Sequence, residues 1–79
     1  MRKIIDVKPL DDYQLELTFD NGIVKIKDMK PYLSKGVFKK LKDKQLFNSV
    51  KIAFDTISWN KEIDLCVDYL YETSKEKIN

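Results

Sequence analysis

The strictest alternation of apolar and polar residues covers residues 13–20. Its apolar positions are Tyr13, Leu15, Leu17 and Phe19. A period of two that holds over eight residues predicts a β-strand with one face in the core and the other in solvent. We therefore expect a half-buried strand here, with these four side chains on its inner face.

The dipeptide Asn21-Gly22 follows this strand and predicts a β-hairpin. In a two-residue loop both residues take positive φ, which suits Asn and Gly in a type I′ turn. Residues 23–28 then return as the next strand, and the loop length sets the register between the two strands. The pairs expected from that register are Phe19–Val24, Leu17–Ile26 and Glu16–Lys27.

Two other regions have strand character. Residues 4–10 predict an N-terminal strand. Residues 51–54 and 57–59 predict a second hairpin around residues 55–56, which are weaker turn formers than Asn-Gly. The pairs expected in the second hairpin are Phe54–Ile57 and Ile52–Trp59.

The apolar period changes between the hairpins and again at the end of the chain. Residues 37–41 repeat at helical spacing, and residues 44–48 predict a short helix with Asp43 as its N-cap. Residues 67–76 predict a terminal helix. The expected fold is α+β: a small, mostly antiparallel sheet of about five strands, made of two hairpins and an N-terminal strand, with short helices between the hairpins and a C-terminal helix.

Composition limits the chemistry that this chain can carry. Its 79 residues suffice for one domain, residues 1–79, with a thin core. The sequence contains no histidine, which removes Ser-His and Cys-His nucleophile pairs and histidine metal sites. We therefore expect no enzyme activity, no cofactor and no small-molecule substrate.

The single cysteine and the hydropathy profile bear on location. Cys66 has no second cysteine to pair with inside the chain, so a disulfide framework is excluded. A small domain without disulfides suits a reducing compartment. No apolar run has the length of a signal peptide or a membrane span. The expected location is the cytoplasm, with no membrane contact.

Several short motifs stand in a distinctive order along the chain. They are Lys8-Pro9-Leu10, then Leu15, Leu17 and Phe19 before Asn21-Gly22, Asp28-Met29-Lys30-Pro31, Gly36-Val37-Phe38 with Leu41 and Asp43, Trp59, Asp64-Leu65-Cys66 and Leu70-Tyr71. In this order they resemble the small bacterial and archaeal domain-of-unknown-function family 2442. The likeness covers nearly the whole chain. Two departures are Lys61-Glu62, where the family has Asn-Gly, and Val67, where it has Pro.

The resemblance implies an α+β domain with a mostly antiparallel sheet. It implies no activity, because none is assigned to the family. Some relatives are fused to DNA-binding domains or encoded beside putative toxins, which implies a regulatory or antitoxin-like role by association only.

Asp64 and Asp68 lie four residues apart near the expected start of the terminal helix. They could form a carboxylate pair or a weak metal site, but a hard cation needs more oxygen ligands than this segment offers. We favour a structural role, with Asp64 accepting a backbone N–H to order the link before the helix. No catalytic or metal-ligating residue is assigned.

Cys66 and the aromatic residues of the last third allow two interpretations each. Cys66 could be an activated nucleophile at a helix start, but we favour a buried, inert cysteine. Trp59, Tyr69 and Tyr71 could present an aromatic platform to a partner. Packing in the core is the interpretation that we favour, because an aromatic residue that ends a strand usually packs inward.

A cluster of lysines lies in residues 35–44. Its members are Lys35, Lys39, Lys40, Lys42 and Lys44. Such a surface could bind nucleic-acid phosphates, yet the only arginine of the chain is Arg2 and no nucleic-acid-binding motif accompanies the lysines. A solvated helix face is the favoured interpretation, and a nucleic-acid-associated domain is the alternative.

The function expected from these observations is a small non-enzymatic protein-interaction or regulatory module. Its partner is another protein or a second copy of the chain, because a thin core and open sheet edges favour a dimer. The candidate interaction residues are Lys39, Lys40, Lys42, Lys44, Trp59 and Tyr71. The residues expected to have structural roles are Asn21, Gly22, Trp59, Asp64 and Asp68.

Overall fold

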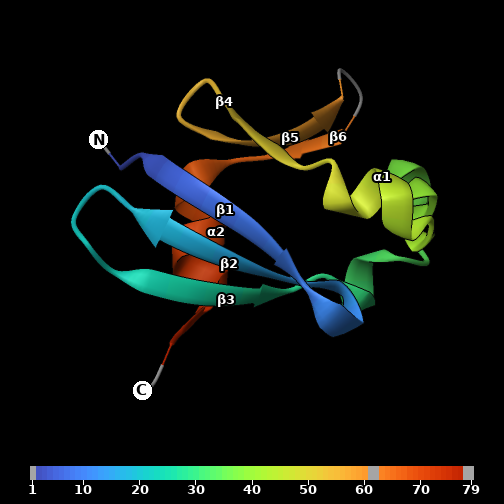
Figure 1. Cartoon of the computed structure of the whole chain (residues 1–79), viewed down its shortest axis with the longest axis horizontal. Coiled ribbons are helices and arrows are strands. Elements are labelled where there is room, and N and C mark those ends of the chain that lie inside the picture. Colours follow the sequence, from blue (N-terminus) through green and yellow to red (C-terminus); the bar gives the residue numbers. More distant parts are fainter. Residues whose placement is uncertain (1, 61–62, 78–79) are drawn as a thin grey trace.

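The computed structural model describes residues 2–60 and 63–77 and shows an α+β fold (Figure 1). The strands form two antiparallel sheets, one of four strands and one of three. The predicted class and the antiparallel pairing are therefore confirmed. The expected single sheet of about five strands is not, because the described residues form two sheets with two more strands than the sequence indicated.

The strands and helices have the following bounds. The four-stranded sheet has the spatial order β1 (Ile4–Leu10), β2 (Gln14–Phe19), β3 (Val24–Asp28) and β7 (Lys75–Glu76). The three-stranded sheet has the order β4 (Lys51–Ala53), β5 (Thr56–Asn60) and β6 (Ile63–Leu65). The helices are α1 (Lys44–Asn48), α2 (Val67–Thr73) and the 3-10 segments η1 (Asp11–Tyr13), η2 (Lys30–Tyr32) and η3 (Gly36–Lys42).

Several local predictions match these bounds. Strand β1 and helix α1 begin and end as predicted, and the Asp43 carboxylate caps α1 by accepting the Gln45 N–H at 3.0 Å. Helix α2 starts at the predicted residue but ends at Thr73, because the chain then pairs with β3 as β7. Strands β6 and β7 are too short to give a periodic signal in the sequence.

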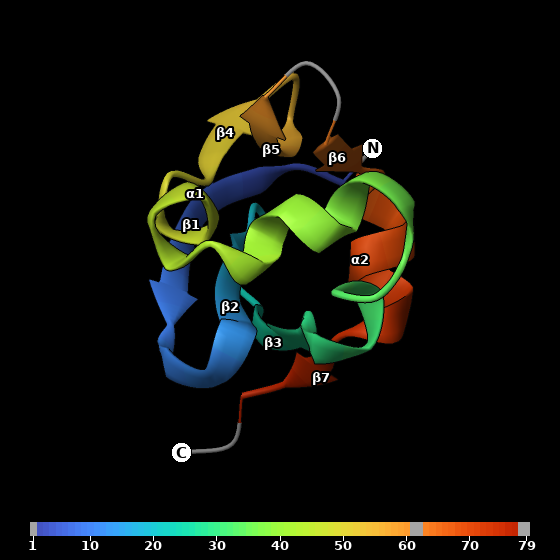
Figure 2. The same ribbon diagram turned by 90° about the vertical axis from the view of Figure 1, so that its right-hand side faces the viewer.

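The two sheets, α2 and the segment from η3 to α1 surround the core. In Figure 1 the three-stranded sheet lies above β1, and α2 lies behind the four-stranded sheet. Figure 2 shows η3 crossing on the near side, with α2 to its right. The sheets meet where β1 begins, since the Ile4 N–H donates to the Asp55 carbonyl at 2.9 Å. On β5, Ile57 and Trp59 are buried against the core, so the opposite, outer face of the three-stranded sheet points away from it.

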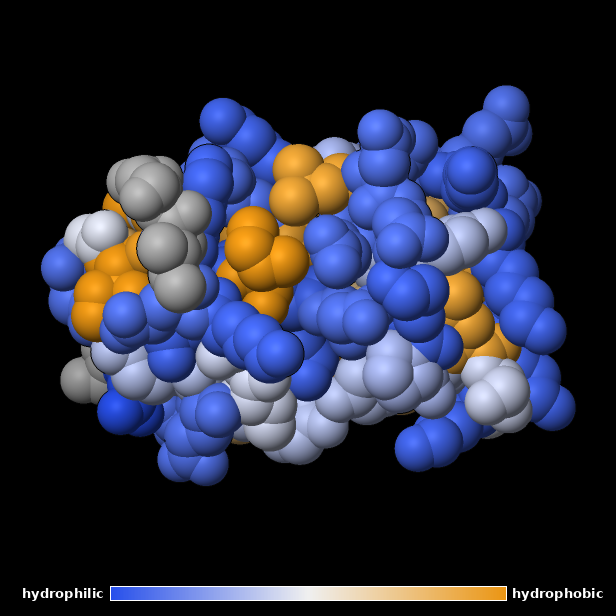
Figure 3. Space-filling view, turned by 90° about the horizontal axis from the view of Figure 1, so that it is seen from below, coloured by the Kyte–Doolittle hydropathy of each residue, from blue (hydrophilic) through white to orange (hydrophobic). Residues whose placement is uncertain are grey.

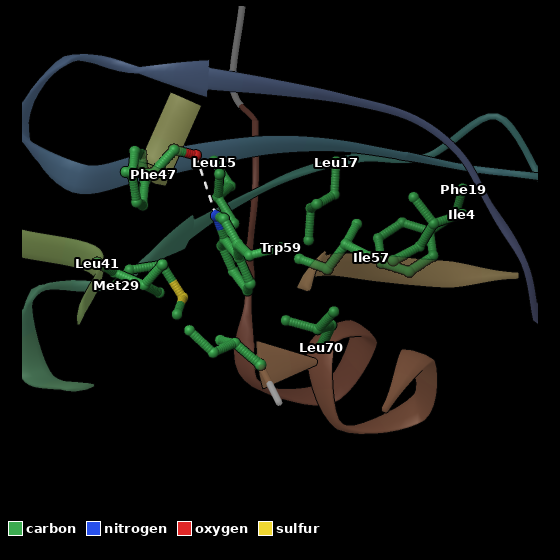
Figure 4. Packing of buried hydrophobic residues seen from close by; sticks show 11 residues of the cluster. Ile4, Leu15, Leu17, Phe19, Met29, Leu41, Phe47, Ile57, Trp59 and Leu70 are labelled. Carbon is green, nitrogen blue, oxygen red and sulfur yellow. Dashed lines mark hydrogen bonds between the residues drawn. The ribbon is translucent and has the colours of Figure 1, made fainter. Parts of the chain in front are cut away.

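Side chains from all of these elements fill the core (Figure 4). Leu15, Leu17 and Phe19 are fully buried, as the alternation in β2 predicts. Trp59 is 5% exposed, and its indole Nε1–H donates to the Phe47 carbonyl at 3.0 Å. The predicted burial of Trp59 is confirmed. The expected Phe54–Ile57 pair is wrong, because Ile57 is buried while the Phe54 side chain is completely exposed.

The first hairpin has a different register from the predicted one. Phe19 lies opposite Ile23, whose carbonyl accepts the Phe19 N–H at 2.9 Å. Of the two turn residues only Gly22 has positive φ, +86°, and its N–H donates to the Phe19 carbonyl. Residues 20–22 thus form a three-residue loop, a type I turn followed by a left-handed glycine. The Asn21 carboxamide helps to select it, because its Oδ1 accepts the Ile23 N–H at 3.0 Å.

This one-residue change exchanges the two faces of β3. Lys25 lies opposite Leu17 and Lys27 opposite Leu15, so both lysines point toward the core, where they are 9% and 5% exposed. The apolar residues of β3 turn to the outer face and are half-buried there. The predicted Glu16–Lys27 pair is wrong, and the Glu16 carboxylate instead accepts from the Lys77 ammonium at 2.7 Å.

The second hairpin also turns at a different place from the predicted one. Its loop is Phe54-Asp55, with φ values of 52° and 69°, which is the left-handed pair of a type I′ turn. The observed pairs are Ala53–Thr56, Ile52–Ile57 and Lys51–Ser58. The predicted turn at residues 55–56 was chosen for residue type, whereas the structure places an aromatic residue at the first left-handed position.

Candidate interaction site

Asp64 and Asp68, the two carboxylates that the sequence singled out, have different surroundings in the structure. Asp64 is exposed within β6, and no donor in the described part of the chain bonds to its carboxylate, so the predicted backbone contact is wrong. Asp68 lies in the first turn of α2, where its Oδ1 accepts from the Arg2 guanidinium at 3.2 Å. Within the described ranges, no three His, Cys, Asp or Glu side chains are grouped as a metal site requires.

Cys66 occupies the N-cap position of α2. Its side chain is exposed, so the expected burial is wrong. The reason is local: Cys66 lies between β6 and α2, where the chain passes over the surface, while Ile63 and Leu70 on either side supply the buried contacts.

Tyr71 packs against cations and an aromatic ring. The Lys25 ammonium lies 3.9 Å and the Arg2 guanidinium 4.1 Å from its ring centre, both within cation–π range. Phe19 meets the ring edge-on at 4.9 Å. The Asn21 amide donates to the Tyr71 hydroxyl at 3.3 Å. Tyr71 therefore links the first hairpin to α2, and its ring is already in contact on several sides.

The two core-facing lysines of β3 were missed by the sequence reasoning. The Lys25 ammonium donates to the Tyr71 carbonyl at 2.5 Å, and the Lys27 ammonium donates to the Thr73 hydroxyl at 2.8 Å. The Lys27 ammonium also lies 5.1 Å from the ring centre of Tyr69. Burial lowers the pKa of Lys27, which the nearby Tyr69 and Asp28 partly oppose. These lysines fasten α2 to the sheet.

The lysine cluster of residues 35–44 lies on η3 and the start of α1. The side chains of Lys35, Lys39, Lys40, Lys42 and Lys44 are exposed. Asp43 is the only acidic residue in this segment, and its carboxylate is occupied by capping α1. The cluster thus forms a basic surface, as the sequence indicated.

A hollow of about 590 Å³ lies on the outer face of the three-stranded sheet. The residues that matter most for its chemistry are Lys51, Ala53, Phe54, Thr56, Ser58 and Asp64. Lys51, Ser58 and Asp64 form one row across the three strands, because β4 pairs Lys51 with Ser58 and β6 pairs Asp64 with Ser58. The hollow thus has a cation on one side and an anion on the other.

The hydroxyl groups of this hollow are turned toward the protein backbone. Thr56 Oγ1 donates to the Leu65 carbonyl at 2.6 Å, and Ser58 Oγ donates to the Asn60 carbonyl at 2.9 Å. Their hydrogen atoms are therefore engaged, and the floor presents mainly carbon atoms to a partner. This suits an apolar side chain better than a polar ligand.

Phe54 stands at the rim of the hollow and is 100% exposed. Its φ of 52° lies in the left-handed region, which a bulky non-glycine residue occupies only at an energetic cost. Sequence reasoning missed this exposed ring because it placed Phe54 inside a strand over residues 51–54, whereas β4 ends at Ala53. By contrast, the face seen from below in Figure 3 is mainly hydrophilic, and its apolar patches are separate.

No helix in residues 2–60 or 63–77 combines the length and the apolar character that a membrane crossing requires. The sequence departure at residues 61–62 lies outside the described residues.

Comparison with known proteins identifies the family without adding a function. A family model described as protein of unknown function DUF2442 matches residues 4–76. No curated protein matches the chain. No solved structure matches it either. Because the match covers nearly all of the sequence, it confirms the resemblance found in the motifs. The chain belongs to the DUF2442 family of proteins of unknown function.

Proposed function

We propose that this protein is a small non-enzymatic protein-interaction module with a regulatory, antitoxin-like role in the cytoplasm. Its binding surface is the outer face of the three-stranded sheet, around the hollow beside Phe54. The partner is a protein that offers an apolar side chain to the floor of the hollow and polar groups to Lys51 and Asp64. The lone Cys66, which has no second cysteine to pair with in the chain, supports the proposed reducing compartment.

The exposed phenyl ring of Phe54 is the observation that supports this proposal. A soluble domain gains nothing from a completely exposed aromatic side chain at a strained turn position, because Asn, Asp or Gly relieves the strain there. Aromatic residues are also the side chains most often found as anchors in protein interfaces. A contact between Phe54 and a partner accounts for both the exposed ring and the strained turn position.

The positions of the polar residues favour binding over catalysis. Asp64 lies in the row across the sheet, whereas Asp68 is paired with Arg2. The buried ammonium groups of β3 contact α2 and are withdrawn from solvent. A general base near a nucleophile is the first requirement of acyl transfer, and the chain has no histidine to supply one.

A capture experiment with a matched control tests the proposal. The tagged wild-type chain, the variant Phe54→Asn and the variant Val37→Ser serve as baits in a lysate of the source cell, with and without nuclease. Val37 is 41% exposed and lies outside the hollow, so it controls for a general loss of apolar surface. We expect Phe54→Asn alone to lower partner recovery at least about tenfold. Equal recovery by all three baits contradicts the proposal.

The basic surface on η3 and α1 supports a second candidate function, nucleic-acid association. The observation that favours it is the exposure of the lysines of residues 35–44, combined with the occupied carboxylate of Asp43. Phosphate binding falls steeply as salt rises. We expect the triple variant Lys39→Gln, Lys42→Gln, Lys44→Gln to reduce the salt slope of binding to a DNA or RNA duplex by about three. A protein interface built on apolar anchors shows no such slope.

A further inference from the structure

We infer that the partner of the Phe54 surface is a second copy of this chain, and that two copies exchange Phe54 side chains across a two-fold axis. This inference rests on the proposed function and names the occupant of its binding surface. In a two-fold dimer the same surface patch serves both subunits, so the patch must complement itself. The outer face of the three-stranded sheet carries two features that do so, and a third that favours association.

The first feature is a protruding side chain beside a hollow. Phe54 is fully exposed at the rim, and the hollow of about 590 Å³ is large enough to accept a phenyl ring. Because Phe54 and the hollow lie on one face, a two-fold rotation brings each Phe54 over the hollow of the other copy. One side chain thus accounts for two contacts.

The second feature is the charge pattern of the row across the sheet. Lys51 and Asp64 lie on opposite sides of Ser58, one on β4 and the other on β6. Two strand spacings place their backbones about 10 Å apart, and these two described residues form no ion pair with each other. A copy related by a two-fold axis that runs along the strands, over Ser58, sets Lys51 against the partner's Asp64 and Asp64 against the partner's Lys51. The patch therefore supplies its own counter-charges.

The third feature is the fixed backbone that carries Phe54. The type I′ loop closes directly onto the Ala53–Thr56 pair, and the Asp55 carbonyl accepts the Ile4 N–H from β1. The backbone of Phe54 is thus held from both sheets before any partner binds. A preorganised anchor loses little conformational entropy on association, which raises affinity for a given contact area.

Sedimentation equilibrium across concentrations from about 1 to 500 μM tests the dimer directly. We expect reversible dimerisation of the wild-type chain, and Phe54→Asn should raise the dimer dissociation constant at least about 30-fold, since an anchor is lost twice per dimer. Asn tolerates the left-handed conformation, so the variant keeps its fold and circular dichroism verifies this. Val37→Ser should leave the dissociation constant within about twofold of the wild-type value.

Charge reversal at Lys51 and Asp64 tests whether these two residues face each other across the two-fold axis. Lys51→Glu and Asp64→Lys should each weaken the dimer, because like charges then face each other twice. The double variant should recover at least about half of the lost binding free energy, expressed as the logarithm of the dissociation constant. Single reversals that leave dimerisation unchanged overturn the two-fold arrangement.

The outcomes separate this inference from the proposed function. A wild-type chain that stays monomeric throughout the concentration range overturns the dimer. If Phe54→Asn then still abolishes capture of a partner from lysate, the binding surface stands and its occupant is a different protein. If Phe54→Asn changes neither dimerisation nor capture, both proposals fail.

Discussion

The two hairpins of this fold contrast in how well their turn residues suit their turns. The first hairpin contains Asn21-Gly22, the pair best suited to a type I′ turn, yet it forms a three-residue loop in which only the glycine is left-handed. The second contains Phe54-Asp55, a poor pair for the same turn, and adopts the type I′ geometry. The intrinsic preferences of the turn residues therefore do not by themselves determine the turn type of either hairpin.

Packing explains the difference. In the first hairpin the longer loop turns Lys25 and Lys27 beneath α2, where their ammonium groups reach Tyr71 and Thr73. In the second, the two-residue loop keeps Ile57 and Trp59 in the core and leaves Phe54 outside. The first hairpin does not form the type I′ turn that its residues favour, and its lysines contact α2. The second hairpin forms a strained type I′ turn and leaves the Phe54 ring exposed. Strain without an internal contact points to a contact outside the chain.

The largest expected effect comes from removing the main contact between the second hairpin and the core. Trp59→Ala removes a nearly buried ring and the Nε1–H bond to Phe47, so we expect a loss of about 3–5 kcal/mol in the free energy of unfolding. Denaturant titration followed by circular dichroism measures it. Trp59→Phe is the matched control, because it keeps most of the apolar contact and should lose roughly half as much. Equal losses would show that packing contributes little here.

A charge reversal on the inner face of β3 tests the corrected register of the first hairpin. Lys27→Glu places an unpaired carboxyl group against Tyr69 and beneath α2, so we expect a destabilisation of about 3 kcal/mol. Lys39→Glu is the control, because Lys39 is exposed on η3 and its reversal should change stability by less than about 0.5 kcal/mol. Thermal melts of both variants decide the matter. The two-residue register predicts similar small effects for both.

Substitution at the left-handed glycine tests the turn of the first hairpin. A Cβ atom at Gly22 would meet no neighbour within 4 Å, so the effect of Gly22→Val comes from φ of +86° and not from a clash. We expect a destabilisation of about 1–2 kcal/mol by chemical denaturation. Gly22→Asn should lose less, because Asn tolerates positive φ. Identical losses for both variants would argue against backbone strain as the cause.

The matching substitution in the second hairpin should have the opposite sign. Phe54→Asn places a residue that tolerates the left-handed region at φ of 52°, and it removes no contact inside the chain. We therefore expect the isolated domain to gain about 0.5–1 kcal/mol while it loses its partner. Denaturant unfolding at a concentration below dimerisation measures the gain. A loss of stability instead would show that Phe54 packs within its own chain.

The sequence predicted those features whose physical cause is local. Alternation in residues 13–20 predicted the buried face of β2, and Asp43 was correctly assigned as the N-cap of α1. The registers failed because they depend on distant partners: no local pattern reveals that Tyr71 and Thr73 will bind the ammonium groups of β3. The surface proposed for interaction was missed for a related reason. Lys51 and Asp64 become neighbours of Ser58 only after three strands have paired.

The smallest expected effect concerns the partly exposed Glu16–Lys77 ion pair, which distinguishes the observed register from the predicted one. The corrected register gives the Glu16 carboxylate a partner in Lys77, whose ammonium group donates at 2.7 Å. Glu16→Gln should therefore cost at most about 1 kcal/mol, as is usual for such pairs. The double-mutant cycle with Lys77→Gln should return a coupling energy of a few tenths of a kcal/mol. The cycle with Lys27→Gln should return none, because Lys27 lies on the opposite face of the sheet.

The pH dependence of the free energy of unfolding shows in which direction the Glu16–Lys77 pair acts. The hydrogen bond from Lys77 lowers the pKa of Glu16 below its ordinary value near 4.5, against a smaller opposing effect of burial. Below the ordinary pKa the unfolded chain binds the proton first, so folding loses stability as pH falls from about 4.5 through the lowered pKa. Stability curves of the wild type and Glu16→Gln should therefore converge at low pH and separate above pH of about 5. Curves that run parallel through this range would show that the Glu16–Lys77 pair does not form in solution.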